Sequence, residues 1–123
     1  MSYVVDASAV IAILFREDGF EGALPYLRSG VLSDVNRAEV YQRYVRNGED
    51  PDGLDGVLRK LGLSFDRPRP EDAEVAGRLG TIRNLALADR YCIATAARLG
   101  VPAVTADRPW ADLDLPVAVE LIR

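Results

Sequence analysis

The chain has 123 residues and a mass of 13.4 kDa, which is the size of one ordinary globular domain. Hydrophobic residues make up 49% and charged residues 28%, and these proportions exclude disordered, collagen-like and coiled-coil proteins. The net charge of −4 gives no electrostatic indication of nucleic-acid binding, although every basic residue except Lys60 is arginine, the side chain suited to paired phosphate contacts.

Apolar runs of two kinds alternate along the chain. Short β-rich runs predict strands, and longer runs bounded by caps and glycines predict helices. Strands are expected at residues 3–5, 31–32, 63–65, 103–105 and 117–122. Helices are expected at residues 7–15, 20–28, 34–47, 50–61, 70–79, 85–99 and 109–113. This alternation predicts an α/β fold in one domain over residues 1–123, with a parallel central sheet of about four to five short strands flanked by helices.

The residue types narrow the possible chemistry. With no histidine and only Cys92 as cysteine, the chain can form no His-dependent triad, no zinc site of Cys and His and no internal disulfide. No apolar run is long enough to span a bilayer, and no basic region precedes the first one, so we expect a cytoplasmic protein without a membrane anchor. An enzyme of this composition must use carboxylates, hydroxyls, arginines or an oxygen-bound metal.

Two aspartates follow predicted strands. Asp6 comes directly after the first strand, and Asp107 stands in the same relation to the strand that ends at Thr105. In parallel α/β sheets, ligands bind beyond the carboxyl ends of the strands, so both carboxylates are candidates for a site. Each could instead be the N-cap of the helix that follows it, with Ser8 sharing that task near Asp6.

Two further carboxylates lie on predicted helices. Asp89 shares the most apolar helical face with Cys92 and Ile93. A charge on that face loses hydration, and this free-energy cost destabilises the protein unless another interaction compensates for it. The alternative is a place at the end of that face, where the carboxylate reaches water. Glu39 follows Asn36 by one turn, and Asn36 could bind a ligand or cap the helix. The alternative for Glu39 is an exposed ion pair with Arg43.

We hypothesise that these four carboxylates converge above the sheet. Two carboxylates 5 Å apart repel each other by about 3 kcal/mol at an effective dielectric constant of 20, so a cation is needed among them. Hard oxygen ligands without His or Cys select Mg²⁺ or Mn²⁺. Such an ion activates water and stabilises charge on a phosphoryl oxygen, so this chemistry is phosphodiester hydrolysis without histidine.

Five segments of the chain resemble segments of one known family, and they follow one another in the order and at the spacing found in that family. They are VVDASAVIA at 4–12, NRAEV at 36–40, ADRYCIA at 88–94, GVPAVTADRPW at 100–110 and LIR at 121–123. They resemble the PIN-domain ribonucleases, in particular the VapC-type toxins of bacterial toxin–antitoxin pairs. Each segment is a weak signal alone, but together they cover nearly the whole chain.

The resemblance implies a site and a set of partners. Four carboxylates of the family hold Mg²⁺ or Mn²⁺, and the matching positions here are Asp6, Glu39, Asp89 and Asp107. Supporting polar groups are expected at Ser8, Asn36 and Thr105. The implied function is a metal-dependent endoribonuclease toxin of a type II toxin–antitoxin system. Its implied partners are an RNA substrate, a co-encoded VapB-type antitoxin and a second copy of the chain in a homodimer.

Segment 80–88 departs from the family pattern. Relatives often carry a Gly-rich loop and a serine three residues before the third aspartate, where the serine can cap the helix. Here the segment is shorter, and Ala86 stands at the capping place. We therefore expect Asn84 to take over the cap.

Three other functions compete with the ribonuclease. A catalytically silent PIN-fold binding module has no need for mutually repelling carboxylates. A DNA-directed flap-type nuclease is an alternative because the metal site alone does not distinguish RNA from DNA. A phosphatase of the haloacid-dehalogenase type requires a second acid two residues after the first aspartate, and Ser8 occupies that position.

Overall fold

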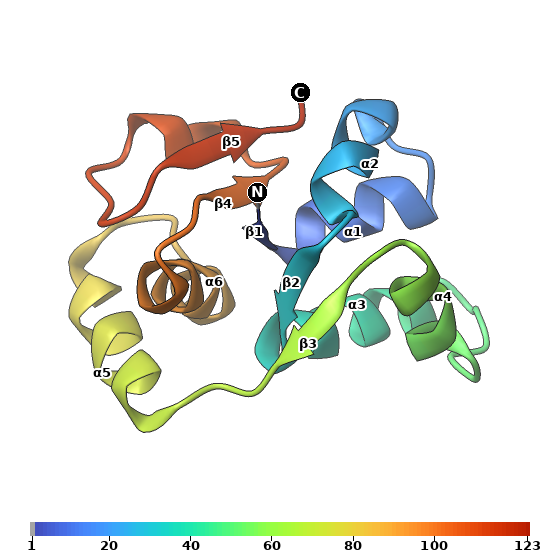
Figure 1. The fold of residues 1–123 in the computed structure, drawn as a ribbon, viewed down its shortest axis with the longest axis horizontal. Helices are drawn as coiled ribbons and strands as arrows, with labels where there is room; N and C mark the ends of the chain where they lie inside the picture. Colours follow the sequence, from blue (N-terminus) through green and yellow to red (C-terminus); the bar gives the residue numbers. More distant parts are fainter. Residues whose placement is uncertain (1) are drawn as a thin grey trace.

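The computed structural model describes residues 2–123 as a parallel five-stranded sheet with helices packed on its two faces (Figure 1). The strands are β1 (Tyr3–Val5), β2 (Gly30–Ser33), β3 (Ser64–Asp66), β4 (Ala103–Thr105) and β5 (Val119–Leu121). Their order is β3-β2-β1-β4-β5, and all neighbours pair in parallel. The predicted α/β fold is confirmed. The strand order reverses beside β1, where parallel sheets place their ligand sites.

Within residues 2–123, six α-helices and two short 3₁₀ helices connect the strands. The α-helices are α1 (Ala7–Leu14), α2 (Phe20–Leu27), α3 (Asp34–Arg46), α4 (Leu54–Lys60), α5 (Pro70–Arg78) and α6 (Leu87–Leu99). The 3₁₀ helices are η1 (Leu79–Thr81) and η2 (Arg108–Asp112). Among residues 2–123, no helix has the length and apolar character needed to cross a membrane.

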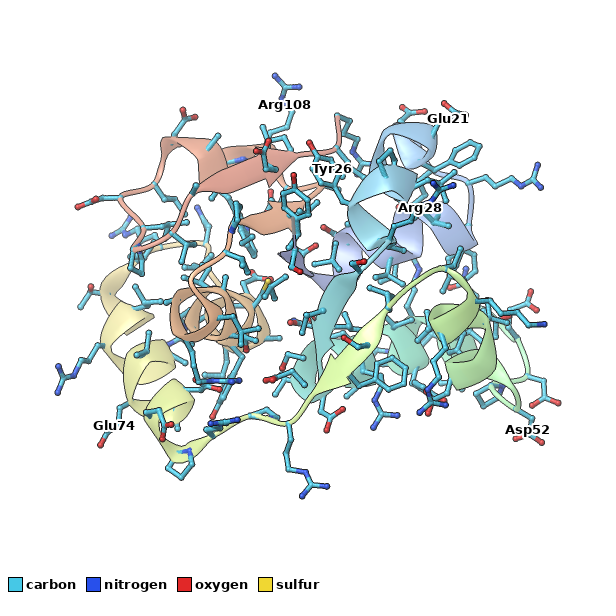
Figure 2. All side chains as sticks on the ribbon, viewed as in Figure 1. Glu21, Tyr26, Arg28, Asp52, Glu74 and Arg108 are labelled. Atoms are coloured by element: carbon cyan, nitrogen blue, oxygen red, sulfur yellow. The ribbon has the colours of Figure 1, made fainter. Side chains whose placement is uncertain are left out.

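The two faces of the sheet have separate cores because successive strand side chains point in opposite directions. Val5 belongs to the core formed with α1 to α4, and its neighbour Val4 packs with α6 and the buried Trp110. Charged side chains such as Asp52, Glu74 and Arg108 are exposed at the periphery (Figure 2). Burial on both faces explains why β1 and β4 read as continuous apolar runs.

Arg98 holds α6 against its neighbours. Its Nε donates a hydrogen bond of 3.0 Å to Asp72 on α5, and its Nη2 forms an ion pair with Asp66 of β3. Asp72 is only 1% exposed and also accepts the backbone N–H of Arg69. A buried carboxylate needs such partners, so this cluster fixes α6, whose first turn carries Asp89.

Two predicted helix starts are wrong. The helix expected from residue 50 begins at Leu54, because Asp50 accepts the N–H of Asp52 in a turn and Gly53 has a φ of +80°. The helix expected from residue 85 begins at Leu87. Asn84 adopts a left-handed φ of +61° and does not cap this helix. The N-cap is Ala86, whose backbone N–H is bound by the Asp89 side chain.

Candidate active site

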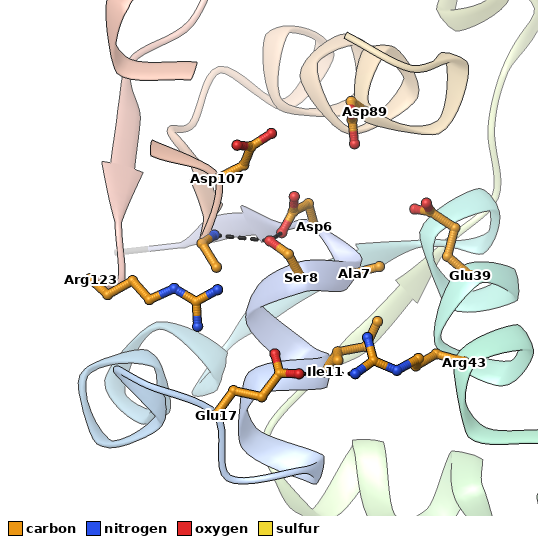
Figure 3. A pocket seen from close by; sticks show the side chains of 11 residues that line it. Asp6, Ala7, Ser8, Ile11, Glu17, Glu39, Arg43, Asp89, Asp107 and Arg123 are labelled. Carbon is orange, nitrogen blue, oxygen red and sulfur yellow. Dashed lines mark hydrogen bonds and ion pairs between the residues drawn. The ribbon is translucent and has the colours of Figure 1, made fainter. Parts of the chain in front are cut away.

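A pocket of about 410 Å³ opens at the carboxyl edge of the sheet, beyond β1 and β4. The four predicted carboxylates line it from four different elements, as Figure 3 shows. Asp6 follows β1, Glu39 lies on α3, Asp89 on the first turn of α6, and Asp107 follows β4. Ser8 also lines the pocket. The topology brings these carboxylates together because the parallel strands end at one edge and α3 and α6 flank it.

None of the four carboxylates forms an ion pair with another residue of 2–123. The alternative pairing of Glu39 with Arg43 is wrong, because Arg43 pairs with Glu17 at 3.0 Å. Within the described chain, no three acidic, His or Cys side chains stand close enough to hold one metal ion between them. The carboxylates therefore share a pocket without meeting at one point.

Asp6 is buried and accepts three hydrogen bonds. Its Oδ1 accepts from Ser8 Oγ at 2.6 Å and from the N–H of Ala9 at 3.1 Å. Its Oδ2 accepts from Thr105 Oγ1 at 2.8 Å. Asp6 is thus the N-cap of α1 and also a wall of the pocket, so the two interpretations of this residue are compatible.

The hydroxyls of Ser8 and Thr105 connect the ends of β1 and β4. Ser8 Oγ accepts the N–H of Ala106 at 2.9 Å, and Thr105 Oγ1 accepts the N–H of Asp107 at 3.0 Å. The two hydroxyl oxygens lie 3.2 Å apart. This network fixes the spacing of Asp6 and Asp107, and it gives both predicted hydroxyls a positioning role.

Burial raises the pKa of Asp6 from 3.8 to about 7, since the charged carboxylate loses hydration at 3% exposure. The hydrogen bonds from Ser8, Thr105 and Ala9 lower this pKa, whereas the charge of Asp89 raises it. Burial also raises the pKa of Glu39 and of Asp89. The pocket therefore disfavours its own negative charges when no cation is present.

In the absence of divalent cations, we expect the free energy of unfolding to fall as the pH rises from 5 to 8. The folded protein holds the Asp6 proton up to a pKa of about 7, whereas the unfolded chain releases it near 3.8. Because the folded state binds more protons in this window, stability decreases with pH, by about 3 kcal/mol between pH 5 and 8 for this group. Asp55 has a lowered pKa, so it titrates below this window.

Urea unfolding in EDTA at several pH values measures this effect. Asp6→Asn should remove most of the fall, because the asparagine has no charge to desolvate. The control Asp112→Asn, at an exposed position outside the pocket, should retain it. A parent protein whose stability is flat or rises between pH 5 and 8 would contradict the assignment.

Asn36 links two carboxylate-bearing helices. It is fully buried, and its Nδ2 donates to Glu39 Oε1 at 3.0 Å and to the carbonyl of Ala88 at 3.0 Å. The first bond orients the Glu39 carboxylate, and the second ties α3 to the first turn of α6 beside Asp89. Asn36 is therefore a positioning residue at this pocket.

Asp89 and Asp107 differ in how they are held. Asp89 Oδ2 accepts a hydrogen bond from the N–H of Ala86 at 3.0 Å. The Asp89 side chain is half-buried near the start of α6, which agrees with the alternative that it lies at the end of the apolar face and reaches water. Asp107 stands at the N-cap position of η2, as the alternative expected, but its side chain makes no capping hydrogen bond, so capping does not account for the carboxylate.

Three charged residues of the pocket were missed by the sequence patterns. They are Glu17, Arg43 and Arg123. Arg43 lies one turn after Glu39 on α3, and that spacing places it near Glu39. Glu17 belongs to the turn after α1 and Arg123 follows β5, so tertiary packing alone brings them to the pocket.

The donor chemistry of the pocket fits a hard divalent cation. Asp6, Glu39, Asp89 and Asp107 offer only oxygen ligands, and none is neutralised by a cationic side chain of residues 2–123. Oxygen donors of this kind suit Mg²⁺ and Mn²⁺. These four side chains are the candidates to hold such an ion, which would have to draw them closer together than they lie here.

Comparison with known proteins identifies a matching family profile and similar folds. The PIN domain family profile matches residues 3–115. No curated protein sequence gives a significant match. A solved toxin–antitoxin complex from Klebsiella pneumoniae resembles the chain with a TM-score of 0.80 at 16% identity, covering 99% of this chain and 98% of that one.

Two further structures show the same fold. One is VapC20 from Mycobacterium tuberculosis, which is described as a sarcin–ricin loop cleaving toxin. It aligns with a TM-score of 0.72 at 16% identity, and the alignment covers 93% of this chain and 96% of the VapC20 chain. DNA-bound VapBC from Salmonella typhimurium has a TM-score of 0.69 at 13% identity, with coverages of 100% and 99%. At these identities the likeness establishes the fold.

Proposed function

Because the chain belongs to the PIN domain family, we propose that it is a metal-dependent endoribonuclease. The observation that carries the proposal is one pocket at the carboxyl edge of the sheet that is lined by four carboxylates without ion-pair partners in residues 2–123. A fold that buries mutually repelling charges loses stability unless they bind a cation. The similarity to VapC20, described as a sarcin–ricin loop cleaving toxin, supports RNA as the substrate class.

Asp6, Glu39, Asp89 and Asp107 would hold Mg²⁺ or Mn²⁺. When bound, the ion stabilises negative charge on a phosphoryl oxygen and lowers the pKa of water. Ser8 and Thr105 keep the Asp6 carboxylate in place through their hydroxyl protons, and Asn36 does the same for Glu39 through Nδ2. The N–H of Ala86 holds one oxygen of Asp89, which leaves the other oxygen without a hydrogen bond from residues 2–123.

The proposed activity is tested by incubating the purified protein with single-stranded RNA and with DNA of the same sequence. We expect RNA cleavage with Mg²⁺ or Mn²⁺, its loss in EDTA, and its recovery when excess ion is restored. Cleavage that persists in EDTA would contradict the metal-dependent mechanism. Cleavage of the DNA alone would favour the flap-type nuclease, and no cleavage of either would favour a silent binding module.

We further propose that the chain is a homodimeric toxin neutralised by a VapB-type antitoxin. This rests on the fold shared with chains from toxin–antitoxin complexes of Klebsiella pneumoniae and Salmonella typhimurium. Expression of the chain alone should arrest growth, and co-expression with the product of a short adjacent gene should give a tight complex and restore growth. A chain that is harmless alone, or whose ribonuclease activity ignores that product, would contradict the toxin proposal.

A further inference from the structure

The carboxylate pocket also has a basic side. Figure 3 shows the guanidinium groups of Arg43 and Arg123 reaching the pocket near Glu17, across from Asp89 and Asp107. The backbone of a nucleic acid carries one negative charge per phosphate, and the four carboxylates repel it. Arg43 and Arg123 are the cationic side chains among the described residues that line this pocket.

Arg43 is held by a weak and exchangeable partner. Its Nη2 lies 3.0 Å from Glu17 Oε2, its Nε bonds Asn47 Oδ1 at 3.3 Å, and its guanidinium stacks on Phe15 at 5.3 Å. The side chains of Arg43 and Glu17 are 42% and 33% exposed, so water and salt screen their attraction. A phosphate, which offers several oxygens to a guanidinium, can therefore replace the Glu17 carboxylate.

Arg123 is fixed beside the same turn. Its Nη1 donates to the carbonyl of Asp18 at 2.7 Å, and it forms no ion pair with a carboxylate of residues 2–123. The turn packs closely against it: a Cβ on Gly19, whose φ is +84°, would lie 2.7 Å from Arg123 Cβ. The guanidinium therefore keeps an uncompensated charge and free N–H donors at a defined place in the pocket.

We propose that Arg43 and Arg123 bind a backbone phosphate of single-stranded RNA next to the bond that is cleaved, and that Glu17 occupies Arg43 until this phosphate displaces it. The inference rests on the proposed ribonuclease function and adds a phosphate subsite to it. Glu17 is then a built-in competitor, because its carboxylate and the RNA phosphate bind the same guanidinium. The pocket volume of about 410 Å³ is within the range of ligand sites.

Fluorescence anisotropy with a labelled eight-nucleotide RNA tests this proposal. All measurements are made in EDTA at two or more salt concentrations, so that binding is read without cleavage. Arg43→Gln should bind about tenfold more weakly, and the slope of log K against log salt should become less steep by at most about 0.7, the value for one phosphate contact on a single strand, because Arg123 still contacts the same phosphate. Arg43→Lys should restore the slope but only part of the affinity, because lysine keeps the charge without the planar fork.

Two variants separate the subsite from general charge effects. Arg46→Gln removes the same charge from an exposed position on the same helix, outside the pocket, and should change the affinity less than twofold. Glu17→Gln removes the competitor and should tighten binding about two- to fivefold. Equal weakening by Arg43→Gln and Arg46→Gln, or no tightening by Glu17→Gln, would overturn the proposal.

This experiment also distinguishes the inference from the proposed function. Arg43-dependent RNA binding by a protein that cleaves no RNA with Mn²⁺ would contradict the ribonuclease function and leave the phosphate subsite in place. RNA cleavage by a protein whose Arg43→Gln and Glu17→Gln variants bind RNA as the parent does would contradict the subsite alone.

Discussion

Asp107→Asn is expected to lower the rate of RNA cleavage by a factor of about 10³ or more while leaving the fold intact. The Asp107 side chain makes no capping hydrogen bond, so asparagine removes a charge without removing structural support. Its backbone N–H still binds Thr105 Oγ1. The variant should lose its cleavage rate and keep its stability, because the proposed role of this carboxylate is to hold the ion.

Asp6→Asn should lower the rate of RNA cleavage by a similar factor. The asparagine Oδ1 can accept the bonds that Ser8 and Ala9 give to Asp6, and its amide can donate to Thr105 Oγ1 if that hydroxyl turns toward Ser8. Initial rates on single-stranded RNA with Mn²⁺, together with circular dichroism, check both variants. Asp112→Asn, an exposed aspartate of η2 outside the pocket, is the matched control and should keep the parental rate. Near-parental cleavage by either pocket variant would remove that residue from the site.

The fold could be predicted because its signals are local. Tyr3–Val5 and Ala103–Thr105 are short β-rich runs buried on both faces, and each is followed by an aspartate and then a helix. This pattern also predicts that Asp6 and Asp107 lie at the same edge of the sheet, since the strands are parallel. Helix starts were less predictable. The turn at Asp50 and the left-handed Asn84 depend on how the chain enters α4 and α6.

Much of the support around the pocket could not be predicted, because it joins residues far apart in the sequence. Asn36 reaches the carbonyl of Ala88, which lies 52 positions away, and Thr105 reaches Asp6 across 99 positions. Neither bond leaves a spacing pattern in the sequence. The same holds for the pairing of Glu17 with Arg43, where the local spacing favoured Glu39 as the partner.

Asp89→Asn is expected to abolish cleavage and yet to keep or raise the stability of the metal-free protein, by 0 to about 2 kcal/mol. Burial and the charge of Asp107 raise the pKa of Asp89, so its surroundings disfavour the ionised form despite the helix N-terminus. The asparagine oxygen still accepts the N–H of Ala86, so the helix start is preserved. A structural carboxylate paired with an arginine would behave in the opposite way, because its replacement destabilises the protein.

The most direct test of the carboxylate pocket as a cation site is the melting temperature of the parent and of Asp89→Asn across a Mn²⁺ titration at pH 8. An ion that binds only the folded state stabilises it by about 2.7 kcal/mol at a concentration of one hundred times its Kd. The parent should therefore melt at steadily higher temperature as Mn²⁺ is added, and Asp89→Asn should start at an equal or higher temperature in EDTA but gain much less. A parent that Mn²⁺ does not stabilise, or a variant that is stabilised equally, would contradict the assignment of these carboxylates to a metal site.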